Sequence, residues 1–174
     1  MSTTRPILLV EDEEHDVLFM KIALEQAEVD VPLQVARDGR EAIAYLNGEG
    51  DFSNRDRYPL PRLVLLDLRL PEVPGMDVLR WIRIQPALVR IPVMIHSSSD
   101  QERDVDEAYR LGVQAYIVKR SDLRGLEEVV RRIKKYWLDA DGPPPDCRDW
   151  LAVTVPPPFS NFSIRRPGTL DPKR

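Results

Sequence analysis

Acidic, hydroxyl and basic side chains stand at or just after the ends of the short apolar runs of this sequence. If these runs are strands, the reactive side chains lie at the strand ends. Glu11 and Asp12 follow one run, Asp67 follows a second, and Ser97 and Lys119 come at the ends of two later ones. The carboxyl ends of parallel strands lie along one edge of a sheet. We therefore expect the three acids to converge if their strands are neighbours.

Three converging carboxylates predict a bound cation. At ~5 Å and an effective dielectric constant of about 20, each ionised pair repels by roughly 3 kcal/mol, so the group must hold protons or a positive ion. An all-oxygen ligand set favours a hard ion such as Mg²⁺, which also binds phosphate oxygens. Such residues suit phosphoryl transfer, with a carboxylate as the nucleophile and a lysine and a hydroxyl binding the transferred group.

The elements that would position these residues alternate along the chain between apolar runs and helical patterns. We expect strands over 7–10, 33–36, 63–66, 92–95 and 115–118, and helices over 13–28, 41–46, 76–84, 101–111 and 121–137, the last capped by Ser121. This order predicts an α/β fold with a parallel sheet covered by helices on both faces. The doubly wound, flavodoxin-like strand order 2-1-3-4-5 is the common solution at this size.

Proline divides the chain near residue 138. The sequence has 174 residues and 16 prolines, and eight of these prolines follow position 138. The runs at 143–145 and 156–158 cannot be helix interior. We therefore expect a compact domain over 1–138 and a proline-rich C-terminal arm over 139–174.

Within this arm, residues 150–155 alternate between apolar and other side chains as a strand does. A strand needs a partner edge, so the arm is a candidate contact for a homodimer. The alternative is the scattered apolar content of a disordered linker. The arm is too short and too rich in proline for a winged-helix DNA-binding domain.

Composition narrows the class of protein further. The formal net charge of −4 gives no electrostatic reason to expect a nucleic-acid or anionic-membrane partner. No apolar run approaches the about 20 residues of a membrane span, and no secretory leader is evident. Cys147 is the only cysteine, so an internal disulfide is impossible. We expect a cytoplasmic protein that acts away from nucleic acid and membrane.

The ordered set of motifs resembles the receiver domain of two-component response regulators over about residues 5–138. The motifs are ILLVED at 7–12, LLDLRLP at 65–71, PGMD at 74–77, IPV at 91–93, Ser97, and AYIVK at 115–119. Within that family, the polar loop before the third strand and the residues around 150–156 resemble the small stand-alone regulators that pair with phytochrome-type histidine kinases.

The resemblance implies a role for each acid. Asp67 would be the phosphoacceptor. Asp12 would ligate Mg²⁺ directly, and Glu11 would ligate it through water. Arg69 would offer its backbone carbonyl to the same ion, which leaves its side chain free to vary.

The resemblance also assigns the phosphoryl-binding and switch residues. Ser97 and Lys119 would contact the phosphoryl group, and Tyr116 would turn inward when Ser97 shifts. Arg120 stands where the family usually has a proline, often after a cis bond. Because a non-proline cis bond costs about 3–4 kcal/mol, we expect a trans bond here. His96 replaces the more usual aliphatic residue, and we expect a structural role for it.

The implied partner is a sensor histidine kinase of the phytochrome type, such as a bacteriophytochrome. Output would be a protein–protein contact rather than classical enzyme activity, with dimerisation through the arm or through the fourth and fifth helices. Two alternatives stay open. A receiver fold could signal without phosphate, and a Mg²⁺-dependent aspartyl phosphohydrolase could use the same nucleophile. Such enzymes carry an acid two residues after the nucleophile, where this chain has Arg69.

Overall fold

A five-stranded parallel sheet forms the centre of the fold, with the strand order β2-β1-β3-β4-β5. The computed structural model describes residues 4–120 and 122–139. The strands are β1 (Ile7–Val10), β2 (Leu33–Ala36), β3 (Leu63–Leu66), β4 (Val93–Ser97) and β5 (Ala115–Val118). The α/β class and the strand order predicted from the sequence are confirmed.

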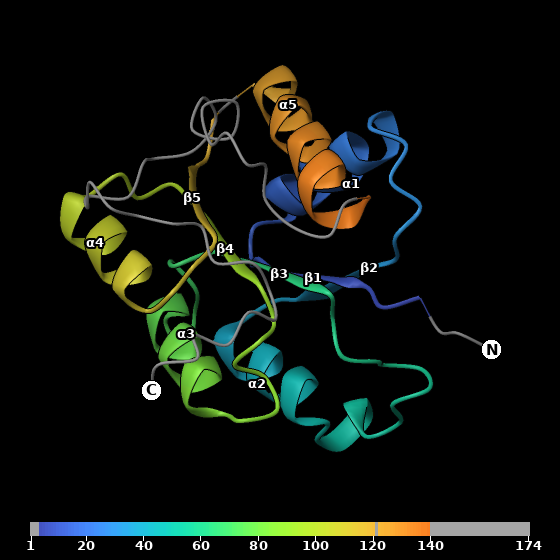
Figure 1. Ribbon diagram of the computed structural model, residues 1–174, viewed down its shortest axis with the longest axis vertical. Coiled ribbons are helices and arrows are strands. Elements are labelled where there is room, and N and C mark those ends of the chain that lie inside the picture. Colours follow the sequence, from blue (N-terminus) through green and yellow to red (C-terminus); the bar gives the residue numbers. More distant parts are fainter. Residues whose placement is uncertain (1–3, 121, 140–174) are drawn as a thin grey trace, which may run out of the picture.

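Helices cover both faces of this sheet (Figure 1). They are α1 (Glu14–Gln26), α2 (Gly39–Asn47), α3 (Gly75–Ile84), α4 (Glu102–Arg110) and α5 (Leu123–Ile133), with a 3-10 turn at Gly50–Phe52 and a π-helical turn at Lys134–Leu138. One apolar core joins the sheet to α1 and α5, and a second joins it to α2, α3 and α4. All four residues of β1 are buried because its successive side chains enter the two cores alternately.

The helical period predicted α1 well. Val17, Met20, Leu24 and Ala27 share one face and are all buried. They pack in the same core as the buried face of α5. This packing fixes the first turn of α1 beside the carboxyl edge of the sheet, directly after Glu11 and Asp12.

The start of α5 differs from the prediction. Asp122, and not Ser121, is the N-cap residue, and its carboxylate accepts a hydrogen bond from the Gly125 N–H at 2.6 Å. A carboxylate at this position also complements the positive end of the helix dipole, which a serine hydroxyl does only weakly. Ser121 itself lies outside the described residues.

The last helical residues extend slightly further than predicted. The helical pattern that we predicted to reach Trp137 continues through the π-helical turn to Leu138, and Trp137 is buried. The strand predicted at 150–155 lies outside the described residues, as does the rest of the arm from residue 140 on.

Candidate metal centre

The ends of β1 and β3 bring three carboxylates together. The register pairs Val10 with Leu66, so Glu11 and Asp67 are level at the carboxyl edge of the sheet. One oxygen from each of Glu11, Asp12 and Asp67 lies within 4.8 Å of the others. Glu11 is 1% exposed and Asp67 is 4% exposed. The convergence predicted from the sequence is therefore present.

Backbone contacts hold Asp67 at this edge. Its N–H donates to the Val10 carbonyl at 3.1 Å, which extends the β1–β3 ladder by one residue. The chain then folds back so that a Cβ added to Gly75 would lie 1.9 Å from the Asp67 carbonyl oxygen. Only glycine permits this close approach, which explains the Pro74-Gly75 entry to α3.

Both oxygens of the Asp67 side chain accept hydrogen bonds. Oδ1 accepts from the Ser97 hydroxyl at 2.7 Å and from the Arg69 N–H at 3.1 Å. Oδ2 accepts from the Lys119 ammonium at 2.6 Å. Ser97 is fully buried and ends β4, which runs further than the predicted 92–95. The carboxylate is thus held in one orientation.

Lys119 is the cation of the site. Its Nζ also lies 2.7 Å from Glu11 Oε2 and 2.7 Å from Asp16 Oδ2. Burial alone would lower the pKa of Lys119, but the hydrogen bonds to Asp16, Asp67 and Glu11 outweigh burial and raise that pKa above its usual value. The lysine therefore stays charged.

The peptide after Lys119 is trans, as predicted, because the described residues contain no cis bond. The Lys119 N–H donates to the Ser97 carbonyl at 2.8 Å, so the β4–β5 ladder continues to this residue. The ladder aims the side chain at the acids although Arg120 follows.

Sequence reasoning missed Asp16. It stands in the first turn of α1, where an acid is expected simply from the helix dipole. The available signal was its closeness in the chain to Glu11 and Asp12. Nothing in the local sequence indicated that Lys119, 103 residues away, would meet it.

The acidic group fits a divalent ion. Burial raises the pKa of Glu11 to about 7, and the Asp67 charge adds to that increase while the Lys119 ion pair opposes it. A carboxyl with such a pKa holds its proton for much of the time at neutral pH unless further positive charge arrives. A hard cation bound by oxygens of the three acids would supply that positive charge.

Tyr116 lies with its ring fully buried. Its hydroxyl donates to the Ser99 carbonyl at 2.9 Å, and the Ser99 hydroxyl donates to Asp104 Oδ2 at 2.6 Å. These two bonds link β5, the β4–α4 loop and the first turn of α4. Tyr116, which we predicted to respond to a shift of Ser97, therefore forms a hydrogen bond with Ser99, two residues after Ser97.

The two histidines lie outside the acidic group. His96 is buried beside it, and burial, followed in size by the nearby Lys119 charge, lowers the pKa of His96 to about 4. Its imidazole is neutral at physiological pH. His15 is exposed on α1.

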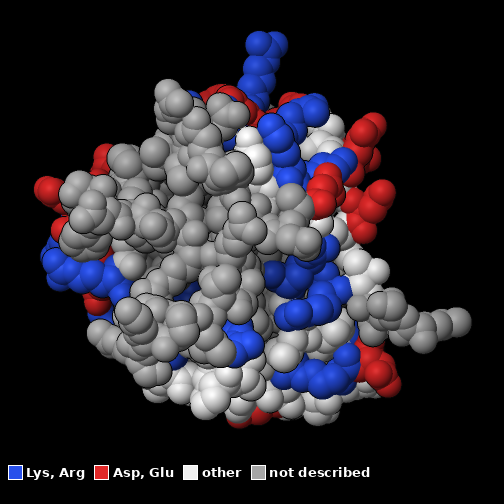
Figure 2. Space-filling view, viewed as in Figure 1, with Lys and Arg blue, Asp and Glu red and all other residues white. Residues whose placement is uncertain are grey.

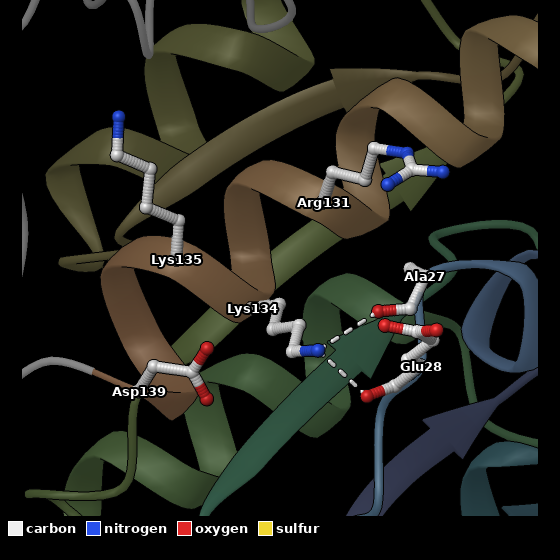
Figure 3. Close-up of a pocket in the computed structure, with 6 residues that line it drawn as sticks. All are labelled: Ala27, Glu28, Arg131, Lys134, Lys135 and Asp139. Carbon is white, nitrogen blue, oxygen red and sulfur yellow. Dashed lines mark hydrogen bonds between the residues drawn. The ribbon is translucent and has the colours of Figure 1, made fainter.

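A separate pocket lies where α1 ends beside the last turns of α5 (Figure 3). Its lining consists of Ala27, Glu28, Arg131, Lys134, Lys135 and Asp139. Lys134 donates to the Ala27 and Glu28 carbonyls at 3.0 and 2.7 Å, which Figure 3 marks by dashed lines. This lysine satisfies carbonyls that the end of α1 leaves open, and none of the acids of the metal centre lines the pocket.

In the described part of the chain, no helix combines the length and apolar character needed to cross a membrane.

The fold and the acidic edge define a class of protein. The family model of the response regulator receiver domain matches residues 7–131, and the chain belongs to this family. The chain is 39% identical over 133 residues to the response regulator Rcp1 of Synechocystis sp. (strain ATCC 27184 / PCC 6803 / Kazusa), which covers 76% of this chain and 88% of Rcp1.

The solved structures that are similar to this chain include a phytochrome response regulator. The phosphorylated cyanobacterial phytochrome response regulator RcpA is 40% identical, with a TM-score of 0.72 over 78% of this chain and 95% of that one. The Mn²⁺-bound form of Rcp1 is 38% identical, with a TM-score of 0.72 over 80% and 99% of the two chains.

Proposed function

We propose that this chain is a single-domain response regulator that accepts a phosphoryl group on Asp67 in the presence of Mg²⁺. The observation that carries the proposal is the environment of Asp67. Ser97 and the Arg69 N–H donate to one of its oxygens and Lys119 donates to the other, with Glu11 and Asp12 beside it. The same donors suit the oxygens of a transferred phosphoryl group.

The metal would be held by Glu11 through water, by Asp12 and Asp67 directly, and by the backbone carbonyl of Arg69. Bound there, Mg²⁺ supplies positive charge to the phosphoryl oxygens. The Mn²⁺-bound relative Rcp1 supports a divalent ion in this family. The choice of Mg²⁺ follows from the all-oxygen ligand set.

In the transfer itself, an oxygen of Asp67 attacks the phosphorus of a phosphohistidine. A P–O bond forms while the P–N bond breaks, and the imidazole leaves with the bonding electrons and takes a proton from water. Lys119 neutralises charge on one phosphoryl oxygen, and the Ser97 hydroxyl donates to another. Beyond this transfer and slow hydrolysis of the acylphosphate, we assign no enzyme activity.

The switch would start at Ser97. When its hydroxyl leaves Asp67 Oδ1 for a phosphoryl oxygen, the β4–α4 loop moves with it. Tyr116 donates to the Ser99 carbonyl of that loop, so its inward position depends on where the loop lies. Phosphorylation would then shift a two-state equilibrium of the surface formed by α4, β5 and α5.

The partner that donates the phosphoryl group is a sensor histidine kinase of the phytochrome type. The similarity to RcpA, a phytochrome response regulator by name, supports this choice. We propose that residues 1–138 are the receiver domain and that 139–174 form an arm that contributes to a homodimer in the cytoplasm.

Labelling with acetyl phosphate tests the central claim. We expect wild type to gain one phosphoryl group by intact-mass measurement when Mg²⁺ is present, and Asp67→Asn to gain none. The amide keeps the size of the side chain but is a far weaker nucleophile. In a second arm, an autophosphorylated phytochrome-type kinase replaces acetyl phosphate, and an unrelated kinase serves as control.

The other outcomes separate the alternatives. A folded wild type that binds Mg²⁺ and stays unlabelled would favour a receiver that signals without phosphate. Rapid turnover of phosphomonoesters would favour an aspartyl phosphohydrolase. Equal labelling of Asp67→Asn would place the acceptor elsewhere.

A further inference from the structure

The Lys119 ammonium is shared by three carboxylates from three separate segments. Glu11 follows β1, Asp67 follows β3, and Asp16 belongs to α1. The distances from Nζ are 2.7 Å to Glu11, 2.6 Å to Asp67 and 2.7 Å to Asp16. Nζ donates hydrogen bonds to Asp16 Oδ2 and Asp67 Oδ2 and forms an ion pair with Glu11 Oε2, so the three carboxylates together fix its position.

Asp16 differs from the other two carboxylates. Glu11 and Asp67 belong to the group whose oxygens lie within 4.8 Å of one another, and Asp16 does not. Its side chain is 35% exposed, whereas those of Glu11 and Asp67 are 1% and 4% exposed. Asp16 therefore holds the ammonium from the solvent side of the site.

The position of Asp16 is fixed by its helix. Val17, the next residue, is buried, and its N–H donates to the Glu13 carbonyl at 3.1 Å. Met20, one turn further, is buried in the core that α1 shares with α5. The carboxylate is thus presented from a packed helix rather than from a free loop, which favours a directed contact.

A divalent ion at the acidic group changes the balance around Lys119. It attracts the carboxylates of Glu11 and Asp67 and repels the ammonium. The lysine stem has four carbons and is flexible, so an ammonium that loses two of its three carboxylate partners is able to turn outward. Asp16 is the acceptor that the ion does not share.

We propose that Asp16 is a positioning residue that keeps the Lys119 ammonium beside Asp67 once a divalent ion occupies the acidic group. This role rests on the proposed phosphoacceptor function of Asp67, because the ammonium is useful there only if a phosphoryl group arrives. Asp16 acts through Lys119 and does not touch the transferred group.

Three variants of the full-length chain test this role. Asp16→Asn removes the charge and keeps the size. Asp16→Glu restores a carboxylate with a longer stem. Glu14→Gln removes a charge from the same turn of α1 and is the matched control, since Glu14 is exposed and makes no ion pair in the described structure.

The first readout is the initial rate of labelling by acetyl phosphate at saturating Mg²⁺. We expect Asp16→Asn to lower this rate about tenfold, which is less than the about 100-fold that a 1 Å misplacement can cost, and Asp16→Glu to recover part of the loss. Because the rate is compared at saturating Mg²⁺, a change in Mg²⁺ affinity does not enter it, and Asp16 lies outside the group of oxygens that would hold the ion. Glu14→Gln keeps the wild-type rate.

The second readout does not depend on phosphorylation. The ammonium signal of Lys119 is observed by ¹⁵N NMR and identified by its absence in Lys119→Arg. With Mg²⁺ bound, we expect this signal to persist in wild type and in Glu14→Gln and to be lost by exchange with water in Asp16→Asn.

Each departure from this pattern has a defined meaning. A Lys119 signal that persists in Mg²⁺-loaded Asp16→Asn, or is already lost in Mg²⁺-loaded wild type, overturns the proposal. An unchanged labelling rate in Asp16→Asn also overturns it. If wild type takes no label at all, the proposed phosphoacceptor function fails, and the NMR comparison still decides the role of Asp16.

Discussion

At the scale of single residues, the site brings several negative charges and one positive charge together in a buried environment. Three carboxylates, from Glu11, Asp16 and Asp67, contact one ammonium, and Asp12 lies beside Glu11 and Asp67, so the metal-free site is short of positive charge. Burial makes that shortage costly because the surroundings screen it poorly. The shortage should appear in the titration of Glu11.

Stability of the metal-free protein should therefore fall as pH rises through the range in which Glu11 ionises. Its pKa is about 7 in the folded chain against 4.5 for the free side chain, so the folded state binds more protons between these values. Unfolding free energy from Glu11 should drop by about 3 kcal/mol between pH 4.5 and pH 7. Urea unfolding in EDTA at both ends of this range measures it.

Glu11→Gln is the control for this titration. The amide stays neutral at all pH values. Wild type should therefore lose unfolding free energy relative to Glu11→Gln as pH rises. Mg²⁺ should restore wild type more than the variant at high pH. A difference that stays constant with pH would show that Glu11 titrates normally in the folded chain.

At the scale of elements, cationic side chains close the C-terminal ends of the helices. Lys134 donates to carbonyls after α1, Arg55 to the last residues of α2, and Arg83 to carbonyls after α4. Arg62 does the same for the final π-helical turn. Helices in a parallel α/β fold run against the strands, so these negative ends gather at the amino edge of the sheet.

Figure 2 shows Lys and Arg side chains to the right of the grey residues and a further group at the left margin, with Asp and Glu side chains along both margins. The acids of the metal centre follow β1 and β3, at the carboxyl edge. The fold thus places the cationic side chains that satisfy helix ends at one edge of the sheet and the group of Glu11, Asp12 and Asp67 at the other.

Replacing Arg83 should destabilise the protein more than replacing Arg80 on the same helix. Arg83 donates to four backbone carbonyls, those of Val89, Ile91, Leu111 and Gly112. Arg83→Met leaves them unsatisfied and should cost about 2–4 kcal/mol in unfolding free energy, measured by urea denaturation. Burial lowers the pKa of Arg83, but a guanidinium remains charged at neutral pH.

Arg80→Met is the matched control. Arg80 pairs with Asp77 and Glu107, and all three side chains are more than 40% exposed. Exposed ion pairs contribute little, so this variant should lose less than about 1 kcal/mol. Equal losses of unfolding free energy in the two variants would mean that the hydrogen bonds from Arg83 to the carbonyls stabilise the fold no more than the exposed ion pairs of Arg80.

At the scale of the whole molecule, the arm should determine the oligomeric state. If the alternating segment 150–155 pairs with a second copy, Val153→Asp on its apolar side should convert a dimer to a monomer. Light scattering after size-exclusion chromatography measures the mass. Thr154→Asp, which adds the same charge to the other side, should leave the dimer intact.

Two results would contradict this use of the arm. A dimer that survives Val153→Asp would direct attention to the surface formed by α4, β5 and α5. If the wild-type chain is already a monomer, the proposed homodimer does not exist.

Much of this protein could be predicted from its sequence. Apolar runs of four residues, such as 7–10, must be buried on both faces, and helices of period 3.6 must separate parallel strands. Acids placed directly after two such runs must share an edge if the strands are neighbours. These local rules were enough for four of the five strand ranges, the fold class and the group of Glu11, Asp12 and Asp67.

Only the tertiary structure decided which distant groups meet. Asp16 reaches Lys119 because α1 and β5 share one core on the same face of the sheet, and this contact could not be seen in a helix turn where acids are common. Asp122 caps α5 one residue after the serine that the sequence suggested, and both residue types are common caps, so the sequence alone did not decide between them. The sequence determined which residues carry charge, and packing across the sheet determined which charges share one ammonium, because that depends on distances between segments far apart in the chain.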